Sequence, residues 1–105
     1  MDRILRDVQE RLSGAPFGLT ADRVHAELLR LAERIGLEVR SEPFDLKVIA
    51  GKGGLCWLRG EPVVVMDAGL PVLDKIGVLA RALAALDLEA IYVPPFLRAR
   101  IARAR

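Results

Sequence analysis

The stretch from Pro71 to Leu88 constrains the fold of this chain more than any other feature. Its sequence, PVLDKIGVLARALAALDL, is typical of a long helix, and the part from residue 77 to residue 86 holds one charged side chain, Arg81. A helix that is apolar on nearly all sides must be buried by the rest of the chain or by a partner. The sequence therefore predicts a structural helix at the centre of the packing.

Length and composition indicate one globular domain over residues 1–105. A chain of 105 residues can build one core but not two. Its hydrophobic fraction of 52% and charged fraction of 29% are those of a globular protein. The mean hydropathy of +0.28 favours coverage of some apolar surface by another molecule. We expect a homodimer or a complex with an unidentified protein partner.

The sequence also gives expectations about location and cysteine chemistry. No segment reaches the roughly 18 uninterrupted apolar residues of a membrane span, and the start MDRILRDVQER lacks the apolar centre of a signal peptide. We therefore expect a cytoplasmic protein without membrane contact. A single cysteine, Cys56, excludes an internal disulfide and cannot build a zinc site alone. Its apolar neighbours predict that it is a small buried side chain.

The first third of the chain predicts two amphipathic helices that form a hairpin. The first spans residues 2–13, and the second follows the break GAPFGL, with Thr20 as its N-cap and Gly36 after its last turn. The apolar stripes of the two helices have these members: Ile4, Leu5, Val8 and Leu12, and then Val24, Leu28, Leu31 and Ile35. Neither stripe completes a core alone, so the pair needs a sheet or a second subunit.

The middle of the chain predicts a sheet. Candidate strands cover residues 37–40, 44–50, 55–59 and 63–66, with turns at the glycines of 51–54 and at 59–62. Short turns favour antiparallel pairing. A last short strand is predicted at 90–93 and a terminal helix at 96–105. The expected fold is α+β, with an N-terminal helical hairpin, a small antiparallel β-meander, one long apolar helix packed on the sheet and a short C-terminal helix.

Each sequence feature that could indicate catalysis lacks a residue or a setting that the chemistry requires. The cluster AGKGG at 50–54 lacks the first glycine and the hydroxyl residue of a phosphate-binding loop, and a strand follows it instead of a helix. His25 is the only histidine, and no nucleophile or orienting group stands at a motif spacing from it. Cys56 would need exposure and nearby cations to react. We expect no enzyme activity, no cofactor and no metal.

The C-terminal segment FLRARIARAR is basic and leaves two interpretations open. Arg98, Arg100, Arg103 and Arg105 lie within eight residues of one another. They suit the negative end of a solvated terminal helix, but they would also bind phosphates if Lys47, Lys52 and Arg59 joined them on one face. A nucleic-acid-binding accessory protein is therefore the alternative function.

Residues 60–88 resemble the core of the ImmA/IrrE type of small zinc metallopeptidases. In that family a strand leads through a short turn into a helix reading roughly L-A-H-E-L-G-H, and Val65, Leu70 and Leu79 follow the same spacing here. The resemblance places the two zinc-binding histidines on Arg81 and Ala85 and the catalytic glutamate on Ala82. Arginine and alanine can neither bind zinc nor activate water in this way. The resemblance implies a catalytically inactive relative without metal.

The sequence thus predicts a non-catalytic domain that acts through protein contacts. The expected contact surface is a spare apolar face of the helix at 71–88 or the N-terminal helical pair. The candidate interaction residues are Arg81, Asp87, Arg98, Arg100 and Arg103. Arg81 is expected to reach solvent or to pair with Asp67 or Asp87, because an unpaired buried charge is costly. A salt bridge from Asp87 to Arg98 would explain an acidic residue at the C-terminal end of the main helix.

Overall fold

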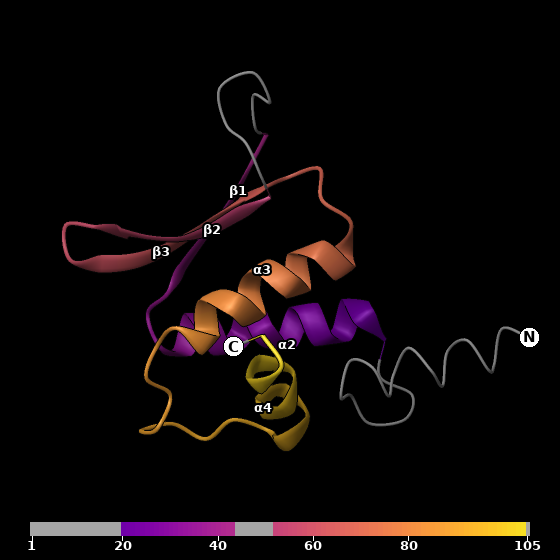
Figure 1. Cartoon of the computed structure of the whole chain (residues 1–105), viewed down its shortest axis with the longest axis vertical. Coiled ribbons are helices and arrows are strands. Elements are labelled where there is room, and N and C mark those ends of the chain that lie inside the picture. Colours follow the sequence, from indigo (N-terminus) through magenta and orange to yellow (C-terminus); the bar gives the residue numbers. More distant parts are fainter. Residues whose placement is uncertain (1–19, 44–51, 105) are drawn as a thin grey trace, which may run out of the picture.

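The structure, a computed structural model, describes residues 20–43 and 52–104 (Figure 1). This part of the chain forms three helices and one three-stranded sheet, so the α+β class is confirmed. The elements in chain order are α2 Ala21–Arg34, β1 Glu38–Glu42, β2 Gly53–Leu58, β3 Glu61–Asp67, α3 Val72–Ala84 and α4 Pro95–Ala102. The helix predicted at 2–13 and the strand predicted at 44–50 lie outside the described residues, so the N-terminal helical hairpin stays a prediction.

The sheet is mixed, and the predicted antiparallel meander is wrong. Its strand order is β1-β3-β2, with β1 parallel to β3 and β2 antiparallel to β3. The central place goes to the most apolar strand: Val63, Val64 and Met66 of β3 are all buried. The chain runs from β1 through the antiparallel strand β2 back to the start of β3. The parallel pair β1 and β3 is therefore connected without a helical crossover.

The turn between β2 and β3 is a two-residue hairpin turn, as predicted for residues 59–62. Arg59 has φ 53° and Gly60 has φ 82°, which is the pair of positive values that a type I′ turn requires. Glycine adopts this conformation freely, whereas an arginine in it is uncommon. The hairpin projects beyond the helices (Figure 1).

Gly53, the first residue of β2, is required by close packing. Its φ is 134°, and a Cβ there would lie 2.6 Å from the Cα of Met66 and would also collide with the carbonyl oxygen of Val65. The adjacent Gly54 has open space around it. Of these two glycines, Gly53 is therefore the one that the pairing of β2 with β3 requires.

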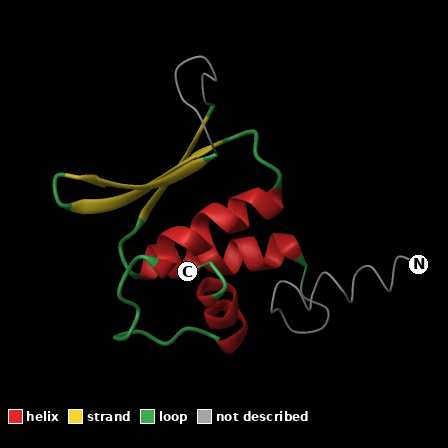
Figure 2. Cartoon of the chain, viewed as in Figure 1, coloured by secondary structure: helices red, strands yellow, loops and turns green. Residues whose placement is uncertain are grey.

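All three helices lie on one side of the sheet (Figure 2). Helix α3 packs against β2 and β3 on one side and against α2 and α4 on others. Six of its side chains are buried, namely Ile76, Val78, Leu79, Ala80, Ala82 and Leu83. Over residues 72–84 the segment is largely buried within the fold. The expected spare apolar face is not found, because Leu73 is the only large exposed apolar side chain of α3.

Helix α3 ends at Ala84, four residues before the predicted end. Beyond it the side chain of Asp87 accepts a hydrogen bond of 3.0 Å from the backbone N–H of Glu89. Such a turn competes with helical hydrogen bonding, and it explains an acidic residue just after the helix. Residues 90–93 continue as loop, so the last predicted strand is wrong.

The flanking helices agree with the sequence patterns. The side chain of Thr20 caps α2 by accepting from the backbone N–H of Arg23 at 3.2 Å, and Gly36 after the helix has φ 75°. Helix α4 turns Leu97 and Ile101 into the core. In residues 20–43 and 52–104, no helix combines the length and apolar content needed to cross a bilayer.

Candidate interaction surfaces

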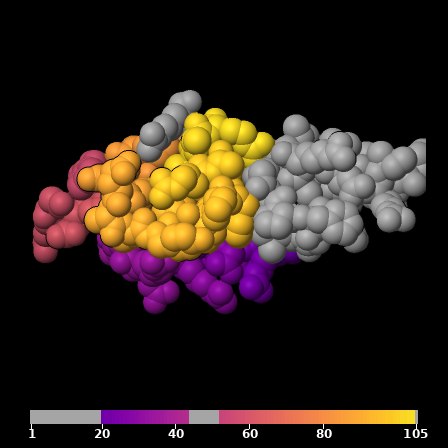
Figure 3. All heavy atoms as spheres, turned by 90° about the horizontal axis from the view of Figure 1, so that it is seen from below, coloured from indigo at the N-terminus to yellow at the C-terminus, as the bar shows by residue number. Residues whose placement is uncertain are grey.

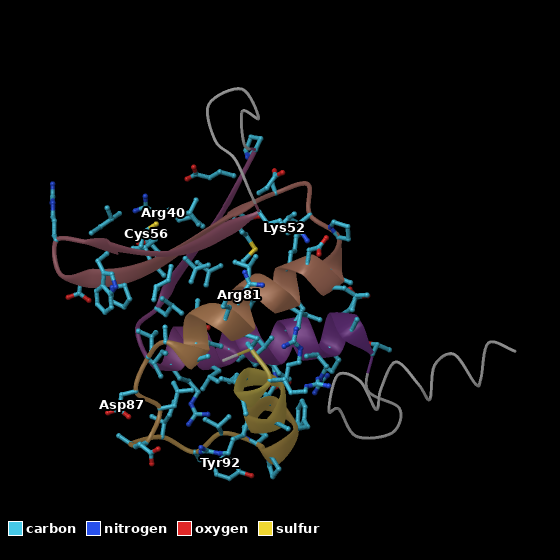
Figure 4. The ribbon with its side chains drawn as sticks, viewed as in Figure 1. Arg40, Lys52, Cys56, Arg81, Asp87 and Tyr92 are labelled. Atoms are coloured by element: carbon cyan, nitrogen blue, oxygen red, sulfur yellow. The ribbon has the colours of Figure 1, made fainter. Side chains whose placement is uncertain are left out.

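The sheet has one face that no described helix covers. Side chains alternate between the faces, and Val64 and Met66 point into the core, so β3 turns Val63 and Val65 to the other face. The register places Glu38 and Cys56 on either side of Val63. In Figure 4, Arg40 and Cys56 lie on the side of the sheet away from α3.

Strand β1 forms one edge of the sheet and is strongly charged. Its sequence, EVRSE, places Glu38, Arg40 and Glu42 together on the uncovered face. The Nε of Arg40 lies 2.9 Å from Oε1 of Glu38. This hydrogen bond and the charge of Glu38 raise the pKa of Arg40. A charged edge discourages pairing with another strand.

Strand β2 forms the opposite edge and carries no charged side chain. Its sequence is GGLCWL, and its last two side chains, Trp57 and Leu58, are 60% and 46% exposed. Trp57 shares the helix-facing side of the sheet with Leu55, and Leu58 shares the uncovered side with Cys56. Cys56 is exposed, so its predicted burial is wrong. The cause is its place on an edge strand and on the uncovered face.

The predicted interaction residues separate into two groups around α4. Arg81 is expected from the sequence to reach solvent or to pair with an acidic side chain. It is exposed on α3, and it makes no ion pair within residues 20–43 and 52–104. Arg100 of α4 reaches across α3, with Nη2 4.0 Å from where a Cβ of Gly77 would lie. The charges of Arg103 and Arg81 both act on Arg100. Arg81 lies one turn after Gly77 on α3, and Arg103 lies one turn after Arg100, so the three arginines lie on adjoining surfaces of α3 and α4.

Arg98 lies apart from these three arginines. It lines a small hollow of about 160 Å3 together with Asp87 and Glu89, where the loop after α3 meets α4. Figure 3 shows the face on which that loop and α4 lie. The predicted salt bridge between Asp87 and Arg98 is not formed in the described part of the chain, where Asp87 instead accepts from the backbone of Glu89.

His25 lies partly buried on α2. Burial has the largest effect and lowers the pKa of His25. The nearby charge of Lys75 lowers this pKa further, whereas the charge of Asp22 raises it.

Lys52, which precedes β2, forms an ion pair with the first turn of α3. Its Nζ lies 2.9 Å from Oδ1 of Asp74. The charge of Lys52 is therefore paired with an acidic side chain of the same chain.

The described residues bring no catalytic constellation together. Cys56 lies on the uncovered face of the sheet and His25 lies in the helical layer on the other side, so no cleft joins them. Residues 20–43 and 52–104 also hold no group of three or more histidine, cysteine or acidic side chains arranged to bind a metal ion.

Comparison of the chain with protein-family models, with curated proteins and with solved structures found no match. The resemblance to the ImmA/IrrE type therefore stays a prediction. Of the three positions that it singles out, Arg81 on α3 and Ala85 directly after α3 are exposed, whereas Ala82 is 4% exposed.

Sequence reasoning missed the exposed apolar end of β2. The apolar sequence from Leu55 to Leu58 is typical of a core strand, so the sequence does not indicate its exposure. The absence of any charge from Gly53 to Leu58 is a signal of an unprotected edge, but only once the strand order is known.

Proposed function

We propose that this protein is a non-catalytic domain that acts through protein contacts, and that its contact surface is the edge of β2. One observation carries the proposal: an edge strand without any charge ends in two large exposed apolar side chains, Trp57 and Leu58. Unpaired backbone groups along such an edge are a template for another strand. Tryptophan is also enriched among the residues that dominate binding energy at interfaces.

We propose further that the strand bound at this edge is β2 of a second copy. Two copies related by a two-fold axis bring the same patch together, so each must complement itself. Strand β2 satisfies this condition because it has no charge that would meet its own copy. Pairing would extend the three-stranded sheet across the dimer and cover Trp57 and Leu58.

We include in this proposal that the domain is a degenerate zincin-like fold that binds no metal. The order of its elements supports this. One helix precedes a small sheet and another lies across it, which is the arrangement expected from the resemblance of residues 60–88. A cytoplasmic location without a cofactor belongs to the same proposal.

Nucleic-acid binding is supported less well by the described surface. Lys52 is paired with Asp74, and Arg59 lies at the end of the β2–β3 hairpin, on a different part of the molecule from α4 (Figure 1). The described basic residues therefore do not form the continuous face that successive phosphates require. Lys47 lies outside the described residues.

The molecular mass of the full chain in solution tests the proposal. Analytical ultracentrifugation over a concentration series should show a dimer of the 11.5 kDa chain. Leu58→Lys should shift the equilibrium toward the monomer, because it places a charge on an edge that otherwise carries none. Leu73→Lys is the matched control, since Leu73 is 53% exposed but lies on α3.

The two variants also define the outcome that contradicts the proposal. A wild-type chain that stays monomeric at every concentration would rule out the second copy as the partner. Equal weakening by Leu58→Lys and Leu73→Lys would show that the contact is not at β2.

A further inference from the structure

Helices α3 and α4 bring three arginines together on one surface. Arg81 comes from α3, whereas Arg100 and Arg103 come from α4 and the residue that caps it. Arg100 extends over Gly77, one turn before Arg81 on α3, with Nη2 4.0 Å from where a Cβ of Gly77 would lie. Because Gly77 has no side chain, the Arg100 guanidinium can lie against this turn of α3.

None of these three guanidinium groups has an acidic partner within residues 20–43 and 52–104. Other arginines of the fold do: Arg23 and Arg30 pair with Glu27, and Arg40 pairs with Glu38. Arg100 is only partly exposed, and burial followed by the charges of Arg103 and Arg81 lowers its pKa. Like charges held close together favour binding of an anion, which would remove their repulsion.

The geometry points to a binding site for a phosphate group, held by Arg81, Arg100 and Arg103. Each guanidinium presents a fork of N–H donors that matches the oxygens of an anion. A phosphate monoester carries nearly two negative charges near neutral pH and has three terminal oxygens. Donors that approach from two different helices can each reach a different oxygen.

The number and origin of the arginines favour phosphate over the other anions. A carboxylate has two oxygens in one plane, and a single arginine can satisfy both of them. A nucleic-acid backbone would need a row of cations, but Arg98 lies on the other flank of α4 beside Asp87 and Glu89. A compact phosphate, either free or on a small molecule, fits these three arginines best. This site is separate from the β2 edge and does not depend on the proposed dimer.

Titration of the full chain with inorganic phosphate, followed by NMR at constant ionic strength, tests the site. We expect saturable shifts of backbone signals around Gly77 and along α4, and of the Arg100 side-chain signal. Acetate and sulfate serve as carboxylate and tetrahedral-anion controls. Arg100→Gln should weaken phosphate binding about tenfold or more, since a hydrogen bond to a charged group is lost. Arg98→Gln, on the same helix, should leave phosphate binding unchanged.

A second measurement covers the case in which Arg100→Gln fails to fold. Arg81→Gln and Arg103→Gln change more exposed side chains, and each should raise the unfolding midpoint slightly without phosphate, because a like charge is removed. The same variants should reduce the gain in midpoint that phosphate gives the wild type.

Three outcomes would overturn the phosphate site. The first is phosphate binding no stronger than acetate binding. The second is equal weakening by Arg98→Gln and Arg100→Gln, which would indicate general charge attraction. The third is binding of a single-stranded oligonucleotide through these arginines while free phosphate does not bind, which would replace a compact site by a polyanion surface.

Discussion

Strands β1 and β2 occupy equivalent places in the sheet but differ completely in chemistry. Each pairs with β3 on one side, and neither has a strand on its other side among the described residues. Strand β1 carries three charges in five residues, whereas β2 has none in six. Charges on an edge oppose strand addition, and an apolar edge allows it. The two edges therefore differ in their side chains and not in their position, and only β2 lacks the charges that oppose strand addition.

The largest expected effect comes from Gly53, where β2 begins to pair with β3. Gly53→Ala should lower the free energy of unfolding by about 3 kcal/mol or more, because the new Cβ meets the backbone of β3 and φ is positive. Urea unfolding measures the loss. Gly54→Ala is the matched control and should change stability little, because nothing lies within 4 Å of its Cβ position. Equal losses in both variants would show that the close contact at Gly53 does not fix β2.

Exchanging the chemistry of the two edges should exchange their behaviour. In a Leu58→Lys background, replacing Glu38 and Arg40 with valine should restore self-association through β1. The stability of the monomer should change little, since the Glu38–Arg40 pair is exposed. Sedimentation of the triple variant beside Leu58→Lys gives the result. A triple variant that stays monomeric would show that charge is not what separates the two edges.

The β2–β3 turn should respond to a residue that tolerates positive φ. Arg59→Asn should raise the free energy of unfolding by about 0.5–1 kcal/mol, because asparagine adopts the left-handed region more readily than arginine. Arg59→Ala separates this effect from loss of the charge, since alanine gains no such advantage. Thermal unfolding of the two variants compares them. Equal gains in both would assign the effect to charge and not to the backbone.

The smallest effect concerns pH and lies away from both edges. The pKa of His25 is lowered in the folded state, so the unfolded chain binds the proton more strongly. Stability should therefore fall as the pH drops below about 6.5, until the folded-state pKa is passed. His25→Gln should flatten this part of the stability profile.

Neither β1 nor β2 contains a histidine, so the monomer–dimer equilibrium should not follow the same profile. Sedimentation across the same pH range checks this. Dissociation that tracks the wild-type histidine titration and disappears in His25→Gln would place the contact near α2 instead of β2.

Local patterns predicted the elements that depend on nearby residues. Thr20 before an apolar stripe of period 3.6 was enough to predict α2, and the Arg59-Gly60 pair between two apolar runs was enough to predict the hairpin. The predicted end of α3 lies too far along the chain. The residues after Ala84 are apolar enough to continue the helix, but the turn in which Asp87 accepts from the backbone of Glu89 replaces helical hydrogen bonds.

The candidate site was predicted less completely. The sequence predicted the arginines of α4, but it could not predict that Arg100 lies against α3 on the side of Arg81 while Arg98 lies beside Asp87 and Glu89. Helical spacing separates Arg98 from Arg100 by about 200° around the axis, and only the docking of α4 on α3 decides which flank finds a neighbour.

The sequence by itself determined the apolar character of the segment that forms α3, the cap of α2 and the absence of charge in β2. Each follows from the chemistry of residues that are neighbours along the chain. Only the tertiary structure decided that β3 lies between β1 and β2, because strand order depends on contacts between residues far apart in sequence. That order makes the uncharged strand an edge, and so turns Trp57 and Leu58 from expected core residues into an exposed surface.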